Sequence, residues 1–69
     1  MENLKLGNKL KHYRTEQKIT QAELGELVGV TRKTVNTVEN NVFVPSTLLA
    51  FKLAKALNLD AEKLFYLYE

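Results

Sequence analysis

The stretch TQAELGELVGVTRKTVNTVENN, Thr20 to Asn41, decides the fold: it predicts two short helices joined by a turn at Gly29. Thr20 is followed three positions later by Glu23, which is the capping-box pattern of a helix N-terminus. Glycine readily adopts the left-handed backbone that follows a helix, so Gly29 should end the first of the two helices. Thr31 is a suitable N-cap for the second. The stretch is therefore predicted to be a helix, a sharp turn and a helix.

The second of these helices, residues 31–40, has two chemically different faces. One face is apolar, because Val35, Val38 and Val42 recur at helical spacing and should point into the core. The opposite face is polar and rich in hydrogen-bond donors: Arg32, Lys33, Asn36, Thr37 and Asn40. Side chains of these types can bond to base edges in the DNA major groove. The pattern favours a helix that packs inward and reads DNA outward.

Length and composition predict one small domain without metal or cofactor. The 69 residues leave room for a single domain over residues 1–69. The chain has no cysteine and its one histidine is His12, which excludes a disulfide and a His/Cys metal site. Domains this small are often stabilised by a disulfide, a metal or a partner chain. With the first two excluded, self-association is the means of stabilisation that remains.

No segment predicts secretion or membrane insertion. The first residues, MENLKLGNKLKHYR, carry charge throughout, unlike a signal peptide. No apolar run approaches the roughly 18 residues that a membrane span needs. We therefore expect a cytoplasmic protein that makes no membrane contact.

The positive charge is concentrated near the start of the chain. The net charge is only +2, but the first 18 residues hold five bases and two acids: Lys5, Lys9, Lys11, Arg14 and Lys18 against Glu2 and Glu16. This excess suits attraction to DNA. It is equally typical of a solvated helix face, and both interpretations stay open.

Apolar spacing predicts three further helices. Leu6, Leu10 and Tyr13 recur at i, i+4 and i+7, which predicts a first helix over residues 6–17. After an extended segment ending at Pro45, a fourth helix should begin at Ser46 or Thr47 and end at Asn58, and a fifth should cover residues 61–65, capped by Asp60. The second helix should bury Leu24, Leu27 and Val28, and the fourth should bury Leu49, Ala50, Leu53, Ala54 and Leu57.

The two ends of the chain are ambiguous. Residues 65–69 (FYLYE) could continue the last helix or form a strand with Leu67 on one side and Tyr66 and Tyr68 on the other. Residues 3–6 also alternate, so pairing of the two ends is an open alternative. The predicted fold class is all-α, with five helices and room for a short C-terminal strand.

With five short helices in place, the chain resembles the phage-repressor-like helix-turn-helix family of Cro, lambda repressor and the XRE regulators. The resemblance runs from Leu6 to Phe65 and departs from the family pattern at two positions. Gly25 stands where the family usually has alanine, and Asn41 stands where it usually has glycine. The matching positions include Arg14, Ile19-Thr20-Gln21, Glu23-Leu24, Gly29-Val30-Thr31-Arg32, Val38-Glu39-Asn40 and Pro45-Ser46.

The resemblance implies roles for individual residues. Arg32, Lys33 and Thr37 are expected to contact bases, and Gln21, Thr34, Asn36 and Asn40 the DNA backbone, although Thr34 and Asn36 could reach either. Arg14 and Glu39 resemble the family's structural ion pair. Plainer alternatives remain: a surface glutamine at Gln21, phosphate contacts from Arg32 and Lys33, and an Asn40 that only caps its helix.

Several apolar side chains fall outside the predicted core and suggest a homodimer interface. They could form one exposed patch, and such a patch on a small chain favours self-association. The members are Leu48, Phe51, Leu59, Tyr66, Leu67 and Tyr68.

Together these features predict a sequence-specific DNA-binding transcriptional regulator, most simply a repressor that binds a palindromic operator as a dimer. The partner is double-stranded DNA, and no small-molecule ligand is expected. The alternative is a protein-binding module of the same fold, antitoxin-like or adaptor. An enzyme is the weakest option and is not expected, because no nucleophile–base set lies at plausible spacing: there is no cysteine, and His12 is most simply an exposed helix residue.

Overall fold

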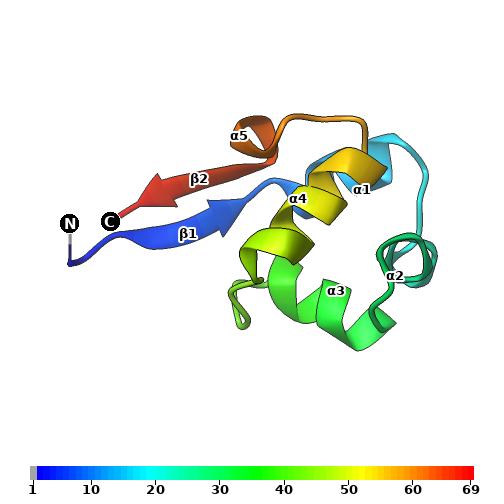
Figure 1. Ribbon diagram of the computed structural model, residues 1–69, viewed down its shortest axis with the longest axis horizontal. Coiled ribbons are helices and arrows are strands. Elements are labelled where there is room, and N and C mark those ends of the chain that lie inside the picture. Colours follow the sequence, from blue (N-terminus) through cyan, green and yellow to red (C-terminus); the bar gives the residue numbers. More distant parts are fainter. Residues whose placement is uncertain (1) are drawn as a thin grey trace.

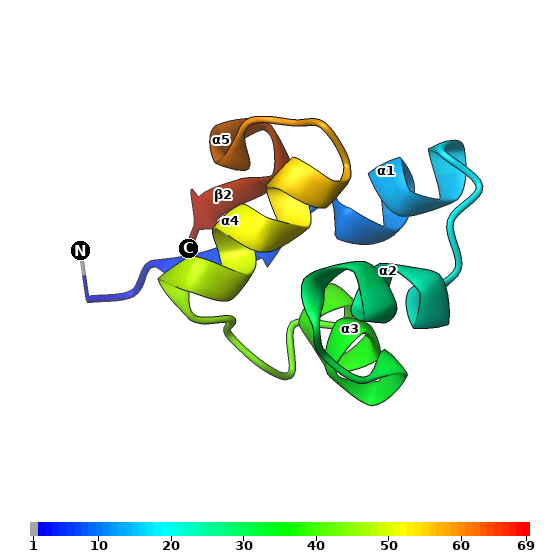
Figure 2. The ribbon, with the colours of Figure 1, turned by 45° about the vertical axis from the view of Figure 1, so that its right-hand side comes forward.

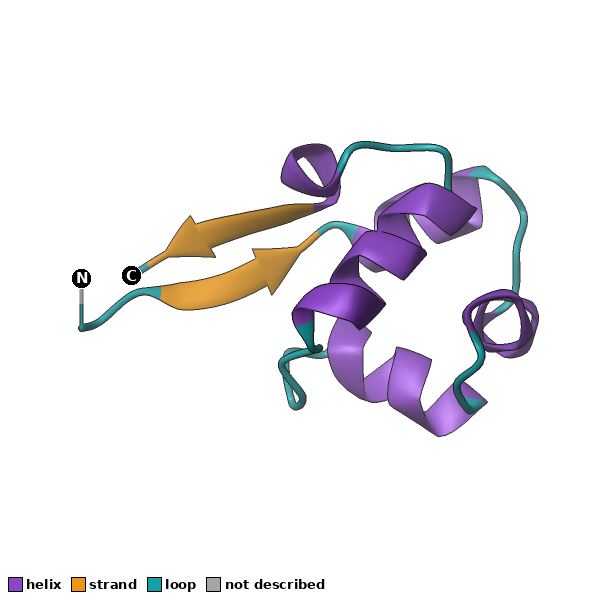
Figure 3. Cartoon of the chain, viewed as in Figure 1, coloured by secondary structure: helices purple, strands orange, loops and turns teal. Residues whose placement is uncertain are grey.

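Five helices and two terminal strands are found within residues 2–69, the part of the chain that the computed structural model describes (Figure 1). The helices form one cluster, and the strands project from it as a two-stranded ribbon (Figure 3). In chain order the elements are β1 (Lys5–Asn8), α1 (Leu10–Glu16), α2 (Gln21–Val28), α3 (Arg32–Glu39), α4 (Thr47–Ala56), α5 (Ala61–Leu64) and β2 (Phe65–Tyr68). The prediction of five short helices is therefore confirmed.

Every helix contributes to a single apolar core. The buried side chains are almost all leucine and valine, the residue types that transfer most favourably out of water. This core holds α2 against both α3 and α4. Its members are Leu10, Leu24, Val28, Val35, Val38, Leu49, Leu53, Ala54, Leu57 and Leu64.

Local hydrogen bonds set both ends of α2 and the start of α3, as predicted. The Thr20 hydroxyl accepts from the backbone N–H of Glu23 at 3.0 Å, and the Glu23 carboxylate accepts from the backbone N–H of Thr20 at 2.9 Å. That bond from the Thr20 backbone, together with one from the Thr20 side chain, lowers the pKa of Glu23 below its ordinary value. Gly29 follows α2 with φ 81°, and the Thr31 hydroxyl accepts from the N–H of Thr34 at 3.2 Å.

Two asparagines end helices in the left-handed conformation. Asn41, at φ 59°, follows α3, and Asn58, at φ 58°, follows α4. Asparagine tolerates this backbone better than other non-glycine residues. At Asn41 it therefore replaces the glycine that the resemblance led us to expect. Ser46 is the cap of α4, since its hydroxyl accepts from the N–H of Leu49 at 3.1 Å. Asp60 lies at the N-cap position of α5 but makes no side-chain cap bond there.

Gly25 lies at the closest approach of α2 to the turn that follows it. A Cβ added to this glycine would lie 2.6 Å from the carbonyl oxygen of Val30 and 3.2 Å from the carbonyl carbon of Thr31. Both are backbone atoms and cannot swing aside. A residue without a side chain therefore lets the turn between α2 and α3 close tightly.

We expect Gly25→Ala to lower the free energy of unfolding by about 1–2 kcal/mol, because the crowding outweighs the roughly 1 kcal/mol by which alanine favours a helix. Urea unfolding followed by circular dichroism measures the change. The exposed neighbour Glu26→Ala is the control and should alter stability by less than about 0.5 kcal/mol. A more stable Gly25→Ala variant would contradict the assigned role of this glycine.

The prediction that the first helix begins at Leu6 is wrong. Residues 5–8 form β1, and α1 begins only at Leu10. The partner of β1 is β2, antiparallel, with Leu6 opposite Leu67 and Gly7 opposite Tyr66. The fifth helix accordingly ends at Leu64, and Phe65 opens β2. Of the alternatives left open for the two ends, the paired strands are the ones formed.

Two apolar residues assigned to the core are exposed. Leu27 is 65% exposed, because α2 turns Leu24, Gly25 and Val28 toward its neighbours. Val42 is 77% exposed, because α3 ends at Glu39 and the left-handed Asn41 redirects the chain. Helical spacing alone does not show where a helix stops.

No helix in residues 2–69 combines the length and the apolar character needed to cross a membrane.

Candidate nucleic-acid interface

The exposed face of α3 and the start of α2 lie side by side on the molecule. Figure 2 shows α2 and α3 packed against each other, away from the terminal strands. Val35 and Val38 are each 1% exposed and anchor α3 to the core. The opposite face of α3 is open to solvent at Arg32, Lys33, Asn36 and Asn40, with Thr34 and Thr37 half-buried. Of the predicted DNA-contact residues of α3, Arg32, Lys33, Asn36 and Asn40 are thus exposed, and the two threonines are partly covered.

A buried ion pair fixes α3 relative to α1. Arg14 Nε lies 2.6 Å from Glu39 Oε2, and Arg14 Nη2 donates to Glu39 Oε1 at 3.2 Å. The third guanidinium nitrogen, Nη1, donates to the carbonyl of Ile19 at 2.8 Å. The side chains of Arg14 and Glu39 are 10% and 2% exposed, so water competes little for these bonds. The bidentate pair and the bond to Ile19 together hold α1, the loop before α2 and the end of α3 in one arrangement.

Gln21 extends this network from α2 to α3. Its Nε2 donates to Glu39 Oε1 at 2.9 Å and to Asn36 Oδ1 at 3.1 Å. Both side-chain N–H groups are therefore used within the protein. Gln21 is also the first residue of α2, where the backbone N–H has no partner inside the helix and the helix dipole favours an anion. The backbone, more than the side chain, is the group of Gln21 available to a phosphate.

Two other predicted contact residues make local hydrogen bonds. The Thr37 hydroxyl donates to the carbonyl of Thr34 at 2.9 Å, so its methyl group and its oxygen lone pairs are what it offers to a ligand. Asn40 Nδ2 donates to the carbonyl of Asn36 at 2.9 Å and to Asn36 Oδ1 at 3.1 Å. The local capping role considered for Asn40 is therefore present, and a phosphate contact from its Nδ2 would require these bonds to break.

Asn8 is a structural residue that the sequence analysis overlooked. Its Nδ2 donates to the carbonyl of Val38 at 2.9 Å and to Asn41 Oδ1 at 3.2 Å, which joins the end of β1 to the end of α3. Its Oδ1 accepts from the N–H of Leu10 at 3.0 Å at the start of α1. A bond from a backbone N–H to the asparagine side chain two positions earlier is an Asx-turn, which is typical of asparagine at a turn before a helix. We missed it because the first helix was extended back to Leu6.

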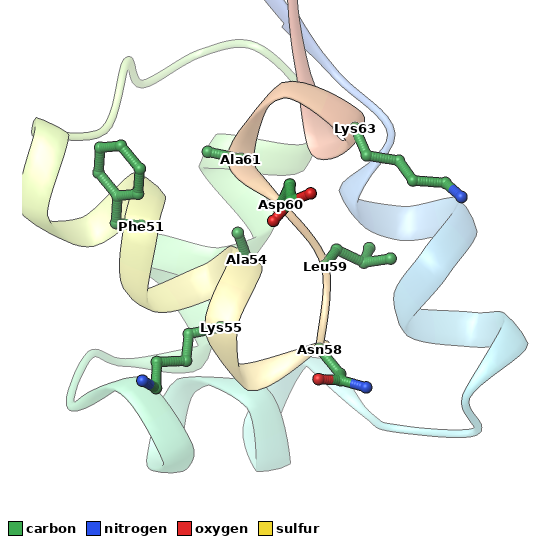
Figure 4. A pocket seen from close by; sticks show the side chains of 8 residues that line it. All are labelled: Phe51, Ala54, Lys55, Asn58, Leu59, Asp60, Ala61 and Lys63. Carbon is green, nitrogen blue, oxygen red and sulfur yellow. The ribbon is translucent and has the colours of Figure 1, made fainter.

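The apolar residues assigned to a dimer interface do not all share one surface. Leu48, Phe51, Tyr66, Leu67 and Tyr68 are exposed, but Leu59 is half-buried and packs against the core. Phe51 and Leu59 both line the hollow between α4 and α5, but the Leu59 side chain points toward α1, and Phe51 lies on α4 at the opposite side of the hollow (Figure 4). Leu59 is therefore removed from the exposed patch. Three exposed residues that we had not assigned to it, Val42, Phe43 and Val44, follow α3.

A short helix with a donor-rich outer face, held by a tight turn against a second helix, defines the helix-turn-helix class of DNA-binding proteins. Residues 10–64 match a helix-turn-helix family, and the chain belongs to this family, of the XRE, Cro and C1 type. The chain is thus a helix-turn-helix DNA-binding transcriptional regulator and not an enzyme.

Relatives of known sequence or structure are similar over most of the chain. The HTH-type transcriptional regulator YgzD of Bacillus subtilis is 47% identical over 62 residues, which cover 90% of this chain and 94% of that protein. The P22 c2 repressor, solved in complex with a synthetic operator, is 30% identical with a TM-score of 0.75, over 78% of this chain and 82% of that one. The restriction-modification controller protein C.AhdI of Aeromonas hydrophila is 31% identical with a TM-score of 0.75, over 78% of each chain.

Proposed function

We propose that this regulator is a repressor that binds a pseudo-palindromic operator as a homodimer, with α3 of each copy in the major groove. The observation that carries the proposal is the shared surface of α2 and α3, on which Arg32, Lys33 and Thr37 would contact bases. The backbone N–H of Gln21 would hold a phosphate beside them. A solved relative, the P22 c2 repressor, is described in complex with an operator.

Exposed apolar side chains support the homodimer. Leu48, Phe51 and Leu67 are each at least 59% exposed, which is unfavourable in water unless another surface covers them. A second copy is the simplest cover, since a two-fold dimer would present two α3 helices roughly 34 Å apart, one turn of DNA. A dimer bound in this way blocks a promoter by occupying it. Because its target is DNA, we place the regulator in the cytoplasm.

The test is selection of bound sequences from random duplex DNA, followed by titration of the selected operator at several salt concentrations. We expect an inverted repeat and an affinity that falls with salt, by a log–log slope of about −0.9 for each phosphate neutralised. A slope near zero would contradict the proposed DNA binding. Selection of a single, non-repeated site would contradict the homodimer.

Analytical ultracentrifugation of two glutamate variants tests the dimer surface directly. Leu48 and Leu27 are both helical and both 65% exposed, but only Leu48 belongs to the proposed interface. We expect Leu48→Glu to shift the protein toward monomer and Leu27→Glu, the matched control, to leave the dimer intact. If both variants remain dimeric, the interface lies elsewhere.

A protein-binding module of the same fold is the second candidate. The exposed run Val42-Phe43-Val44, beside the end of α3, is the observation that favours it, because a protein partner could cover this run. Co-purification with another protein, together with no selected DNA sequence, would support this function instead.

A further inference from the structure

Asn36 lies on the exposed face of α3. Each residue of a helix turns the chain by about 100°, so the positions opposite buried Val35 and Val38 are Lys33, Asn36, Thr37 and Asn40. Within residues 2–69 the structure pairs the Nδ2 of Asn36 with no acceptor, whereas its Oδ1 is fully occupied. The side chain is exposed, so its NH₂ group, but not its oxygen, is available to a ligand.

Two donors occupy the Oδ1 of Asn36. Gln21 Nε2 donates to it from α2 at 3.1 Å, and Asn40 Nδ2 donates to it from the next turn of α3 at 3.1 Å. An amide oxygen has two lone pairs, so both are used. What remains for a ligand is the NH₂ group, which can only donate.

The orientation of the Asn36 amide is fixed by its neighbours Gln21 and Asn40. The orientation of each neighbour is set in turn by an oxygen that can only accept. Glu39 Oε1 accepts from Gln21 Nε2 at 2.9 Å, so the nitrogen of Gln21, and not its oxygen, must face the carboxylate. The backbone carbonyl of Asn36 accepts from Asn40 Nδ2 at 2.9 Å, which fixes Asn40 in the same way. If the Asn36 amide were turned over, its NH₂ would face two other NH₂ groups. Arg14 in turn holds the Glu39 carboxylate in place.

We propose that Asn36 is a specificity-determining residue that donates, and does not accept, in the major groove. This inference rests on the proposed placement of α3 in the groove. An asparagine that reads adenine donates to N7 and accepts from the N6 amino group, and here no lone pair is left to accept. Asn36 therefore favours guanine, through O6 and N7, or thymine, through O4, over adenine, whose N7 accepts but whose N6 amino group would have no acceptor on Asn36. It disfavours the amino groups of adenine and cytosine. Gln21, Glu39 and Arg14 act as positioning residues for this choice.

Asn36→Asp tests the proposal, because aspartate has nearly the same shape but presents an oxygen where Asn36 presents its NH₂. Gln21 and Asn40 can still donate to the inner oxygen, so the local structure has no reason to change. Sequences are selected from random duplex DNA with the wild type, with Asn36→Asp and with Asn58→Asp. The last adds the same charge in the turn after α4, outside α2 and α3.

We expect Asn36→Asp to change one position of each half-site from guanine or thymine to cytosine or adenine. Binding to the original operator should weaken by about tenfold more than in Asn58→Asp, which corresponds to one specific base contact. Gln21→Met frees one lone pair of Asn36, so it should relax the preference at that same position.

Three results would overturn the inference: an unchanged selected sequence for Asn36→Asp, an equal loss of affinity for every sequence, or no relaxation by Gln21→Met. An equal loss would mean that Asn36 contacts phosphate. If the wild type itself selects no sequence, the proposed function fails, and that outcome is distinct from all three.

Discussion

Glu39→Ala should lower the free energy of unfolding by about 3–5 kcal/mol, the largest effect that we expect from a single substitution in this chain. The change leaves the Arg14 guanidinium, whose residue is only 8% exposed, buried without a counter-charge. It also removes one of the two acceptors of Gln21 Nε2. A domain of 69 residues has a total stability of roughly 3–10 kcal/mol, so this loss is a large fraction of the whole. Urea or thermal unfolding followed by circular dichroism measures the loss.

Glu16 provides the matched control for this prediction. It is a glutamate on the surface of α1, 62% exposed, whose carboxylate lies 3.5 Å from His12. Glu16→Ala should change stability by less than about 0.5 kcal/mol, because exposed pairs contribute little. The double variant Arg14→Met/Glu39→Leu should recover part of the lost stability, because it leaves no buried charge without a partner. A loss below about 1 kcal/mol in Glu39→Ala would show that the pair does not hold the helices together.

Replacing both Arg32 and Lys33 by alanine should weaken binding to the selected operator by about 1–3 kcal/mol for each specific base contact that these side chains make. Both side chains are exposed at the start of α3, so folding should be unaffected. The preferred sequence should also become less defined, because phosphate contacts alone carry no base information. Titration of the variant against the operator and against scrambled DNA separates these two effects.

The control for this variant is Lys52→Ala/Lys55→Ala, which removes the same charge from the exposed surface of α4. It should lose only the general electrostatic attraction, equally for all sequences. If the base preference of the Arg32/Lys33 variant equals that of the wild type, direct readout by these two residues is wrong.

Local rules predicted the helix-turn-helix stretch well. The capping box of Thr20 and Glu23, the left-handed Gly29 and the cap at Thr31 each depend on residues within four positions of one another. Such short-range patterns can be read from the sequence without knowing what packs where. The left-handed conformation of Asn41 is local in the same sense, since it follows from its own side chain.

Long-range contacts account for most of the errors. Leu6 looked helical because its strand partner, Leu67, lies at the other end of the chain. Leu27 was predicted to be buried because it has helical spacing. That spacing does not show that only the side of α2 with Leu24 and Val28 faces the core. The contact between Arg14 and Glu39 was expected from family resemblance and not from spacing. The orientation of the Asn36 amide was beyond prediction, because it depends on how closely α2 approaches α3.

The pairing of β1 with β2 has a consequence for the order of folding during synthesis. Asn8 is made well before its partner Phe65, by roughly 3–11 s at about 5–20 residues per second. Until β2 is made, β1 has no strand to pair with, whereas every residue of α1 to α4 is made before Phe65. Asn8 can also bond early to the end of α3, because Val38 is made well before β2. The pairing of the terminal strands is therefore the last part of the fold that can form, after every residue of the helix-turn-helix has been made.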